Sequence, residues 1–572
     1  MWWEASAIET NGIVLTPYSL LNLFVEMSAT KHQVLTLLSR MVKAPPQKAL
    51  SLLTSSAHHT HESISIIIHY LLSLNMLSQA ESFIVRLLSG KMPSPFFTIT
   101  SLLPYLTNNS NSFRVYETII SAHLKAQLPV ERALTLVDEM IDRGFSPSSI
   151  LFNSLLKCLV KEGHFDKAWR VFEKYKGRVG LDVYTFGILI KCCCENDNLE
   201  RGFQVLGQMC DLGFSPNVVV YTTLIDGCCK KGKVEKAKRL FFEMEDIGLI
   251  ANQYTYTVLI NGVFKKGLRK DGFELFERMK SEGALPDLHT YNSVLNAYCS
   301  GGEMRRAFQL FDEMRHRGVT CNVVTYNTLI EGLCKQRNVG EAKRLLGEMT
   351  SCGLRPSLIT YNLLMDGYCR IGMVEKALYL HDQLKSFGLS PTVITYNVLI
   401  AGCARSEDSS RVLDLVGEME ERGISPSKVT YTILIDFFAR SNNMEKALEL
   451  LAYMKRTSLV ADVYTYSVLI KGWCNEGNMR EASKLLGMMC EMEVEPNDVI
   501  YNTMIHGYCI QGSSYKALKL LKEMAEKGMV PNVASYNMTV QVLEGDGKQD
   551  AAHNLLAAML KSGLKPSNTL SF

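Results

Sequence analysis

Short polar side chains recur at two fixed places in a pattern that repeats along the chain. With Val183 counted as position 1 of a unit, position 5 is Asn, Ser or Thr in ten of eleven units, and position 35 is Asp, Asn, Ser or Thr in all eleven. Amide and hydroxyl groups donate and accept hydrogen bonds, whereas an Asp carboxylate only accepts. Such side chains can select a ligand edge by the donors and acceptors that it offers.

Helix capping is the alternative explanation for position 35, because Asp, Asn, Ser and Thr are the preferred residues at helix N-termini. It explains position 5 poorly, since that position follows an aromatic residue inside a predicted helix, where Asn and Thr are indifferent helix formers. The joint restriction of both positions favours recognition, with capping left open at position 35.

The pattern has a period of 35 residues without an insertion. The units begin at Val183, Val218, Gln253, Leu288, Val323, Leu358, Val393, Lys428, Val463, Asp498 and Val533. Position 4 is aromatic in every one of them, from Phe186 to Tyr536. A fixed period of this length is typical of a solenoid.

Each unit contains the apolar spacing of two amphipathic helices. In the unit from Val323, Tyr326, Leu329, Ile330 and Leu333 form one stripe, and a second helix follows until the stop around Gly353. A small residue at position 20 lets the two helices approach closely. We therefore predict an all-α fold, a right-handed superhelical solenoid of stacked antiparallel helical hairpins.

The predicted organisation has four parts. Residues 113–567 form thirteen repeats, regular from residue 183, preceded by a unit one residue short (149–182) and one a residue long (113–148). Residues 61–112 are a degenerate repeat and linker, residues 1–60 an N-terminal segment with a candidate targeting role, and residues 568–572 a tail.

Composition argues against catalysis, metal binding and a membrane span. The chain has 47% apolar and 21% charged residues, a net charge of +3 and no apolar run of the roughly 18 residues that a span needs. The consecutive Cys192, Cys193 and Cys194 lack zinc-site spacing, and seven cysteines recur at position 12, which predicts packing. No nucleophile elbow or P-loop occurs, and Phe572 lies five residues after the last unit, so we expect no enzyme activity, catalytic tail, cofactor or metal.

The units share the consensus V-x-T-Y-N-x-L-I-x-G-x-C-K, then a helix that ends in E-M, then G-x-x-P followed by Asp, Asn or Ser. This consensus resembles the pentatricopeptide repeat family, in its subclass of uninterrupted 35-residue repeats from plant organelles. Tetratricopeptide repeats differ, because their Trp and Gly-Tyr landmarks are absent here. The resemblance implies a protein that binds single-stranded organellar RNA and directs its splicing, end protection, cleavage or translation.

In such repeats one unit contacts one base through two or three side chains, and the resemblance assigns this role to positions 5 and 35. The predicted base-binding pairs are Asn153 with Asp182, Thr222 with Asn252, Thr257 with Asp287, Asn292 with Asn322, Asn327 with Ser357, Asn362 with Thr392, Asn397 with Ser427, Thr432 with Asp462, Ser467 with Asn497, Asn502 with Asn532, and Asn537 with Ser567. The pair Gly187 and Asn217 fits no rule of the family's code. The implied target is 5′-U-N-A-G-Y-Y-Y-Y-G-A-Y-Y-3′, where Y is a pyrimidine.

Two further rows follow from the resemblance. Apolar residues at position 2 would pack against base faces, with packing inside the hairpin as the alternative: Val219, Val324, Ile359, Ile394, Val429 and Val499. Basic residues at position 13 would contact the RNA backbone, with a role at the helix C-terminus as the alternative: Lys230, Lys265, Lys335, Arg370, Arg405 and Arg440.

Two functions are open at this point. The leading hypothesis is a monomer that binds one single-stranded RNA sequence, alone or with other RNA-processing factors, in intron splicing or transcript stabilisation. The alternative is a protein-binding helical-repeat scaffold, which predicts no restriction at positions 5 and 35. The family implies a mitochondrion, with a plastid as the alternative, although residues 1–60 hold one arginine, Arg40, and fit a transit peptide poorly.

Overall fold

The computed structural model describes residues 64–65, 68–69, 71–72, 76–89 and 112–564, and every regular element in this part of the chain is an α-helix. The predicted N-terminal segment 1–60 and the tail 568–572 lie outside the described residues, as does most of 61–112. The chain divides into two compact units, Met1–Ala284 and Leu285–Phe572. We describe each unit by itself.

In the first unit, α5 (Leu77–Leu88) precedes a series of helix pairs. These pairs are α7 (Ser112–Lys125) with α8 (Val130–Asp142), α9 (Ser149–Lys161) with α10 (Phe165–Tyr175), α11 (Val183–Glu195) with α12 (Leu199–Asp211), α13 (Val218–Lys230) with α14 (Val234–Asp246), and α15 (Gln253–Lys265) with α16 (Arg269–Ser281).

The second unit continues the same pattern. Its pairs are α17 (Leu288–Ser300) with α18 (Met304–His316), α19 (Val323–Lys335) with α20 (Val339–Ser351), α21 (Leu358–Arg370) with α22 (Val374–Ser386), α23 (Val393–Arg405) with α24 (Ser409–Glu421), α25 (Lys428–Arg440) with α26 (Met444–Arg456), α27 (Val463–Asn475) with α28 (Met479–Glu491), α29 (Asp498–Ile510) with α30 (Ser514–Glu526), and α31 (Val533–Gly545) with α32 (Gln549–Lys561).

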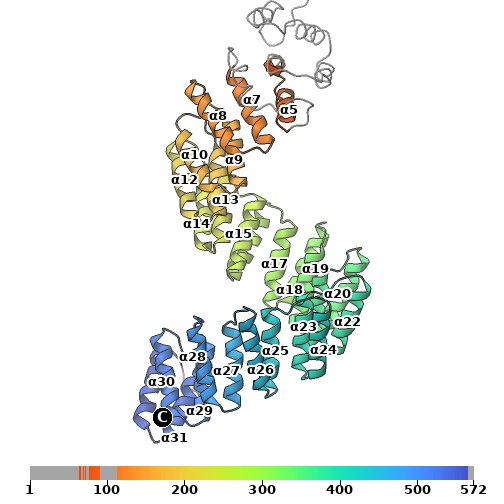
Figure 1. The fold of residues 1–572 in the computed structure, drawn as a ribbon, viewed down its shortest axis with the longest axis vertical. Helices are drawn as coiled ribbons and strands as arrows, with labels where there is room; N and C mark the ends of the chain where they lie inside the picture. The colour runs from red at the N-terminus through yellow and green to blue at the C-terminus, as the bar shows by residue number, and fades with distance from the viewer. Residues whose placement is uncertain (1–63, 66–67, 70, 73–75, 90–111, 565–572) are drawn as a thin grey trace, which may run out of the picture. The chain divides into compact units, whose positions relative to one another are not determined.

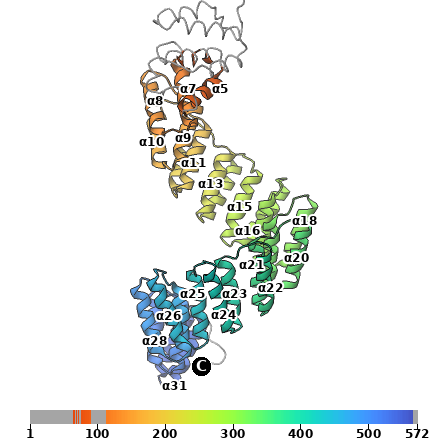
Figure 2. The same ribbon diagram turned by 45° about the vertical axis from the view of Figure 1, so that its right-hand side comes forward.

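Within each unit the hairpins stack in chain order (Figures 1 and 2). The first helix of a hairpin packs on the first helix of the next, as α19 does on α21 and α21 on α23. The second helix contacts its own partner and the first helix that follows, as α20 does with α19 and α21. The predicted all-α solenoid of helical hairpins is therefore confirmed. Within each of the two compact units, the first helices form a row on which positions 5 and 35 lie.

Each second helix ends in a turn that needs a left-handed residue at position 31. At Gly353 (φ 78°), the amide of the next residue, Leu354, donates to the carbonyl of Met349 at 3.1 Å, the six-to-one bond of a Schellman motif. The two units without glycine keep this conformation, since Ser458 and Glu493 have φ of 57° and 58°. The turn geometry thus overrides the residue type.

The aromatic residue at position 4 explains the E-M ending of the second helix. Tyr396 is fully buried, and its hydroxyl donates to Glu418 at position 26 over 3.2 Å. Burial and the nearby Glu418 carboxylate raise the pKa of Tyr396 to about 12. Met419, the next residue, is also fully buried. The pair therefore ties the second helix to the first within one hairpin.

Six of the seven cysteines at position 12 pack against the glycine at position 10 of the following repeat. All seven are buried, and burial raises the pKa of both Cys334 and Cys369 to about 12. A Cβ atom added at Gly367 would lie 2.5 Å from Sγ of Cys334. This contact explains the G-x-C spacing of the consensus, because a larger residue at position 10 would push neighbouring first helices apart.

In the part of the chain that the structure describes, no helix has the length and apolarity to cross a membrane, and no three His, Cys, Asp or Glu side chains gather as a metal site.

We expect Gly367→Ala to lower the free energy of unfolding by about 1–3 kcal/mol, the usual effect of an overpacked core. The matched control is Gly347→Ala inside α20, where an added Cβ has no neighbour within 4 Å. That change is expected to raise stability by about 1 kcal/mol through helix propensity. Denaturant unfolding followed by circular dichroism measures both, and the same sign for the two variants would contradict the packing.

Cysteine modification provides a second test. Iodoacetamide at pH 8 should label the exposed Cys210, Cys352 and Cys490 in the native protein, because a thiol needs access and a thiolate to react. The seven buried cysteines at position 12 should be labelled only after unfolding. Mass spectrometry of peptides resolves each site, and native labelling of Cys334 or Cys369 at the rate of Cys352 would disprove their burial.

Candidate nucleic-acid interface

The residues at position 35 are the N-caps of the following first helices. Oδ1 of Asn322 accepts from the backbone amide of Thr325 at 3.0 Å, and Oδ1 of Asp287 accepts from that of Thr290 at 2.8 Å. Capping, the open alternative, is thus a real role of this row. The N-cap position is held by Asp182, Asn217, Asn252, Asp287, Asn322, Ser357, Thr392, Ser427, Asp462, Asn497 and Asn532. Ser567 lies outside the described residues.

Because the cap bond to the helix uses one oxygen of the side chain at position 35, it determines which polar group of that side chain is left for a ligand. In Asn322 the oxygen is bound to the helix, which leaves the Nδ2 amide as a donor. In Asp287, Oδ1 accepts from both the amide and the hydroxyl of Thr290, which leaves Oδ2 as an acceptor. In the Ser cap Ser427, the oxygen accepts from the amide of Thr430 at 3.3 Å, and the hydroxyl donates to Oγ1 of Thr430 at 3.1 Å. The row therefore carries donors and acceptors in a fixed order.

Two of the aspartates have a pKa below the ordinary value. Burial raises the pKa of Asp462, but hydrogen bonds from Lys428 and from Thr465 outweigh that effect. Burial acts in the same way on Asp182, and hydrogen bonds from Asn153 and Thr185 again outweigh it. Both caps are therefore carboxylates that only accept. The Nζ atom of Lys428 lies 2.9 Å from Oδ2 of Asp462.

The residues at position 5 lie one helical turn inside the same helices. Thr222 and Thr432 are buried, and each hydroxyl donates to the carbonyl four residues before it, at 2.6 and 2.9 Å. Thr257 and Asn153 are buried as well. The remaining members are half-buried, namely Asn292, Asn327, Asn362, Asn397, Ser467, Asn502 and Asn537.

The structure connects positions 5 and 35 of one repeat in two ways. Directly, Nδ2 of Asn153 donates to Asp182 at 3.0 Å. In other repeats a third residue, the hydroxyl at position 3 of the next unit, lies between them. Thr325 illustrates this, with its Oγ1 at 2.8 Å from Oδ1 of Asn292 and 3.1 Å from Oδ1 of Asn322.

The sequence analysis missed position 3. The consensus V-x-T-Y shows the threonine, but a β-branched residue beside the core aromatic is easily taken for packing. What could have indicated its role is a polar residue that recurs next to the buried aromatic residue. The side chains of Thr325, Thr360, Thr395 and Thr430 are fully buried, and buried polar groups are usually hydrogen-bonded.

The apolar row at position 2 does not pack inside the hairpins. The exposed fraction of its predicted members lies between 53% for Val429 and 65% for Val219 and Ile394. Tyrosines occupy the same position in three units, and Tyr184, Tyr254 and Tyr464 are equally exposed. These exposed apolar side chains are two residues after the N-caps and are suited to contact with the flat faces of a ligand.

The basic row at position 13 lies at the C-termini of the first helices, where it complements the helix dipole. Four of its six members also form ion pairs with the acidic residue four positions earlier: Lys230 with Asp226, Lys335 with Glu331, Arg370 with Asp366, and Arg440 with Asp436. Lys265 and Arg405 have Asn261 and Ala401 at that place, and no ion pair within the described residues. This row is therefore only partly available to an anion.

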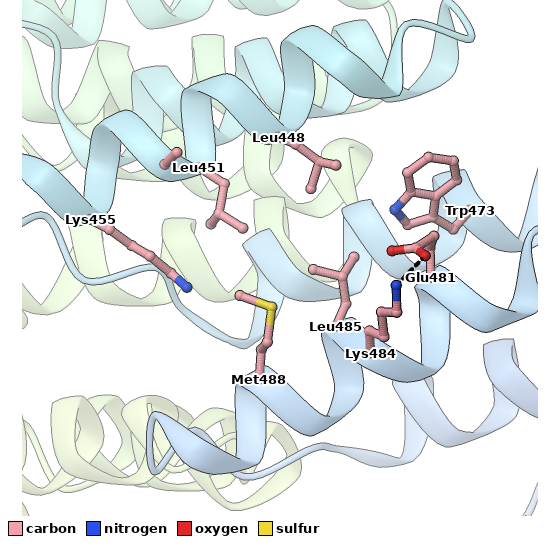
Figure 3. A pocket seen from close by; sticks show the side chains of 9 residues that line it. Leu448, Leu451, Lys455, Trp473, Glu481, Lys484, Leu485 and Met488 are labelled. Carbon is pink, nitrogen blue, oxygen red and sulfur yellow. Dashed lines mark hydrogen bonds and ion pairs between the residues drawn. The ribbon is translucent and has the colours of Figure 1, made fainter.

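The second unit also contains a pocket of about 220 Å³ that is separate from these rows (Figure 3). None of its lining residues belongs to position 5 or 35. In it Lys484 forms an ion pair with Glu481 at 2.6 Å. The lining residues come mainly from α26 and α28: Leu448, Leu451, Ala452, Lys455, Trp473, Glu481, Lys484, Leu485 and Met488.

The chain is similar to known proteins over parts of their length. A pentatricopeptide repeat-containing protein of Arabidopsis thaliana is 53% identical over 204 residues, which are 34% of this chain and 36% of that protein. Two other Arabidopsis relatives bear the words mitochondrial and chloroplastic in their names. They are 35% identical over 94 residues and 32% over 91 residues, each 16% of this chain and 23% and 12% of the relative. The chain thus spans little more than a third of these relatives at most.

The solved structure of the pentatricopeptide repeat protein PPR10 from maize aligns with 91% of this chain and 82% of its own, with a TM-score of 0.63 and 22% identity. That likeness supports the fold.

Family models for the PPR repeat match most of the array. The model described as PPR repeat family matches 147–195, 181–230, 216–265, 258–300, 286–335, 321–370, 356–405, 391–440, 426–475 and 496–545. The model described as PPR repeat matches 464–494. Because these matches cover well over half of the chain, it belongs to the pentatricopeptide repeat family.

Proposed function

We propose that the chain binds one single-stranded RNA sequence, one base per repeat, without catalysis, and that it acts in the processing of an organellar transcript by supporting intron splicing or by protecting transcript ends. The observation that carries the proposal is the N-cap row at position 35, in which the side chain that could face a base is oriented by its bond to the helix, as Asn322 and Asp287 illustrate. We assign this role to the thirteen repeats of 113–567.

The polarity of the caps agrees with the bases that the family's code assigns. On the Watson–Crick edge, G and U carry a ring N–H donor, whereas A and C carry a ring nitrogen acceptor. An Asp cap offers an acceptor and so suits G or U, and an Asn, Ser or Thr cap offers a donor and so suits A or C. For a base to use these groups, the hydroxyls of Ser357 and Ser427 must turn away from the Thr at position 3, and Oδ2 of Asp462 must exchange Lys428 for the base. Among pyrimidines, the four central repeats should therefore prefer C over U.

The size of the side chain at position 5 would distinguish purines from pyrimidines. The short Thr at 222, 257 and 432 leaves space for a purine, and Asn at 292, 327, 362 and 397 reaches further, as suits a pyrimidine. The exposed apolar row at position 2 supports stacking on base faces, which contributes about 1–3 kcal/mol per base in single-strand binders. A bound dozen bases would hold a strand unpaired or block an exonuclease.

We also propose that the protein acts in an organelle. Named relatives are mitochondrial or chloroplastic, and we propose the mitochondrion, with the plastid as the alternative. We further propose that the chain binds RNA as a monomer, alone or beside other RNA-processing factors.

Selection from randomised RNA at low salt tests the proposal. We expect enrichment of A-G-Y-Y-Y-Y-G-A, with C above U at the four central pyrimidines. Recovered sequences without this string, or binding that ignores sequence, would refute it.

The Thr432→Asn variant tests the modular code. With Asp462 unchanged, the pair becomes that of Asn153 and Asp182, so the preference at the ninth base should change from G to U by about tenfold, since a good base contact contributes roughly 1–3 kcal/mol of discrimination. Thr503→Asn is the control, because the Thr503 hydroxyl makes the same bond to the carbonyl four residues earlier but lies at position 6. Binding to RNAs that differ only at that base measures both, and an equal loss for all four bases would disprove the code.

A further inference from the structure

A buried hydroxyl at position 3 follows certain residues at position 5 of the preceding repeat. Wherever another repeat follows, the position is Thr or Ser after Asn or Thr at position 5: Thr185, Thr255, Thr290, Thr325, Thr360, Thr395, Thr430, Thr465 and Ser535. Position 3 is apolar after the two regular repeats in which position 5 is neither Asn nor Thr: Val220 follows Gly187, and Ile500 follows Ser467. The hydroxyl therefore occurs where position 5 has a group that reaches it.

In repeats with Asn at position 5, this hydroxyl binds the amide oxygen. Oγ1 of Thr360 donates to Oδ1 of Asn327 at 2.7 Å and accepts from the backbone amide of Ser357 at 3.1 Å. The same donation occurs at 2.7–2.8 Å from Thr325 to Asn292, from Thr430 to Asn397 and from Ser535 to Asn502. With its oxygen held, each of these amides has only its NH₂ group left for a ligand.

In the repeat that contains Asn153, the Asn side chain at position 5 is turned the other way. The hydroxyl of Thr185 donates to Asp182 at 2.9 Å, and the NH₂ group of Asn153 also turns toward that carboxylate. The amide oxygen of Asn153 is then buried without a partner. In this repeat the carboxylate of Asp182 therefore takes both the hydroxyl proton of Thr185 and the NH₂ group of Asn153.

One repeat departs from the pattern. The hydroxyl of Thr395 lies 3.4 Å from that of Thr392, and the oxygen of Asn362 is buried without a partner.

Helix capping alone does not account for the hydroxyl. Asn217 and Asn497 cap their helices at 3.1 Å through the amides of Val220 and Ile500, which have no hydroxyl. The cap therefore forms without it, and the fold accepts an apolar residue of similar size at this place.

We infer that the hydroxyl at position 3 is a positioning residue for the repeat before it: it holds the amide oxygen of Asn at position 5 and thereby presents the NH₂ group to the base. The inference rests on the proposed function and adds a third residue to the choice of base. An NH₂ donor suits the carbonyl oxygen of a pyrimidine ring, whereas an amide free to rotate would also offer an acceptor and discriminate less.

The test uses the full chain with Thr360→Val, which keeps the shape and removes the hydroxyl. Four RNAs with the predicted sequence differ only at the sixth base, which faces Asn327 and Ser357. We expect about a five- to tenfold loss of affinity for the preferred pyrimidine, the loss of one hydrogen bond, and a smaller loss for the other three. Discrimination at the ninth base should stay unchanged. The midpoint of thermal unfolding should fall by no more than about 4 °C, because the variant loses the bonds of the Thr360 hydroxyl to Asn327 and Ser357.

Two variants make the result specific. Thr360→Ser keeps the hydroxyl and should restore discrimination at the sixth base. Thr328→Val removes a threonine hydroxyl that bonds only the carbonyl of Val324 and should change nothing.

The outcomes separate the two proposals. An unmodified chain that does not discriminate at the sixth or ninth base overturns the proposed function and this inference together. If the unmodified chain discriminates and Thr360→Val keeps the full discrimination, the inference alone is wrong. An equal loss for all four bases would show a purely structural role and would also overturn it.

Discussion

The unsatisfied backbone amides at the start of each first helix are the constraint on which the rest of the interface depends. The first turn of a helix leaves N–H groups without partners, and here the residue at position 35 satisfies one of them in nearly every repeat. Because an oxygen of that side chain is bound to the helix, its orientation is fixed before any ligand arrives. Asp287 and Asn322 differ only in the atom left over, and that atom alone distinguishes an acceptor from a donor. Under the proposed function, helix stability and base recognition therefore use the same side chain and do not compete.

The packing between hairpins keeps these caps in register. The contact of Gly367 with Cys334 sets how closely neighbouring first helices approach, and the bond from Tyr396 to Glu418 sets how the second helix lies on the first. The Gly–Cys contact recurs in six repeats and the Tyr–Glu bond in five, always at multiples of 35 residues. These contacts help to keep the side chains at positions 5 and 35 of neighbouring repeats in register. Since preorganised contacts lose less free energy on ordering when a ligand binds, a rigid row of this kind favours selective binding over merely strong binding.

Most of the fold could be predicted from the sequence because it depends on local, periodic features. The aromatic residue at position 4, the small residue at position 20 and the glycine stop each have one dominant physical reason, and even Ser458 and Glu493 keep the left-handed turn. The hydroxyl at position 3 could not be predicted in the same way, since its partners are 33 residues earlier and three residues earlier in the chain, and only stacking brings them together. The ion pairs at position 13 were within reach of the sequence, because Asp226 and Lys230 have the spacing of helical neighbours.

Those ion pairs decide where specificity must come from. Four of the six basic residues at position 13 already have an acidic neighbour, and Lys428 neutralises Asp462 in the N-cap row itself. Exposed ion pairs of this kind contribute only about 0–1 kcal/mol, so a phosphate can replace the acidic side chain. The free energy gained on binding is then only the difference between the new pair with phosphate and the old pair with the carboxylate. A chain with a net charge of +3 and such a row has little charge with which to hold any polyanion. If the chain binds single-stranded RNA as proposed, its affinity must therefore come mainly from contacts with base edges and faces, the role that we propose for the caps, position 5 and the exposed row at position 2.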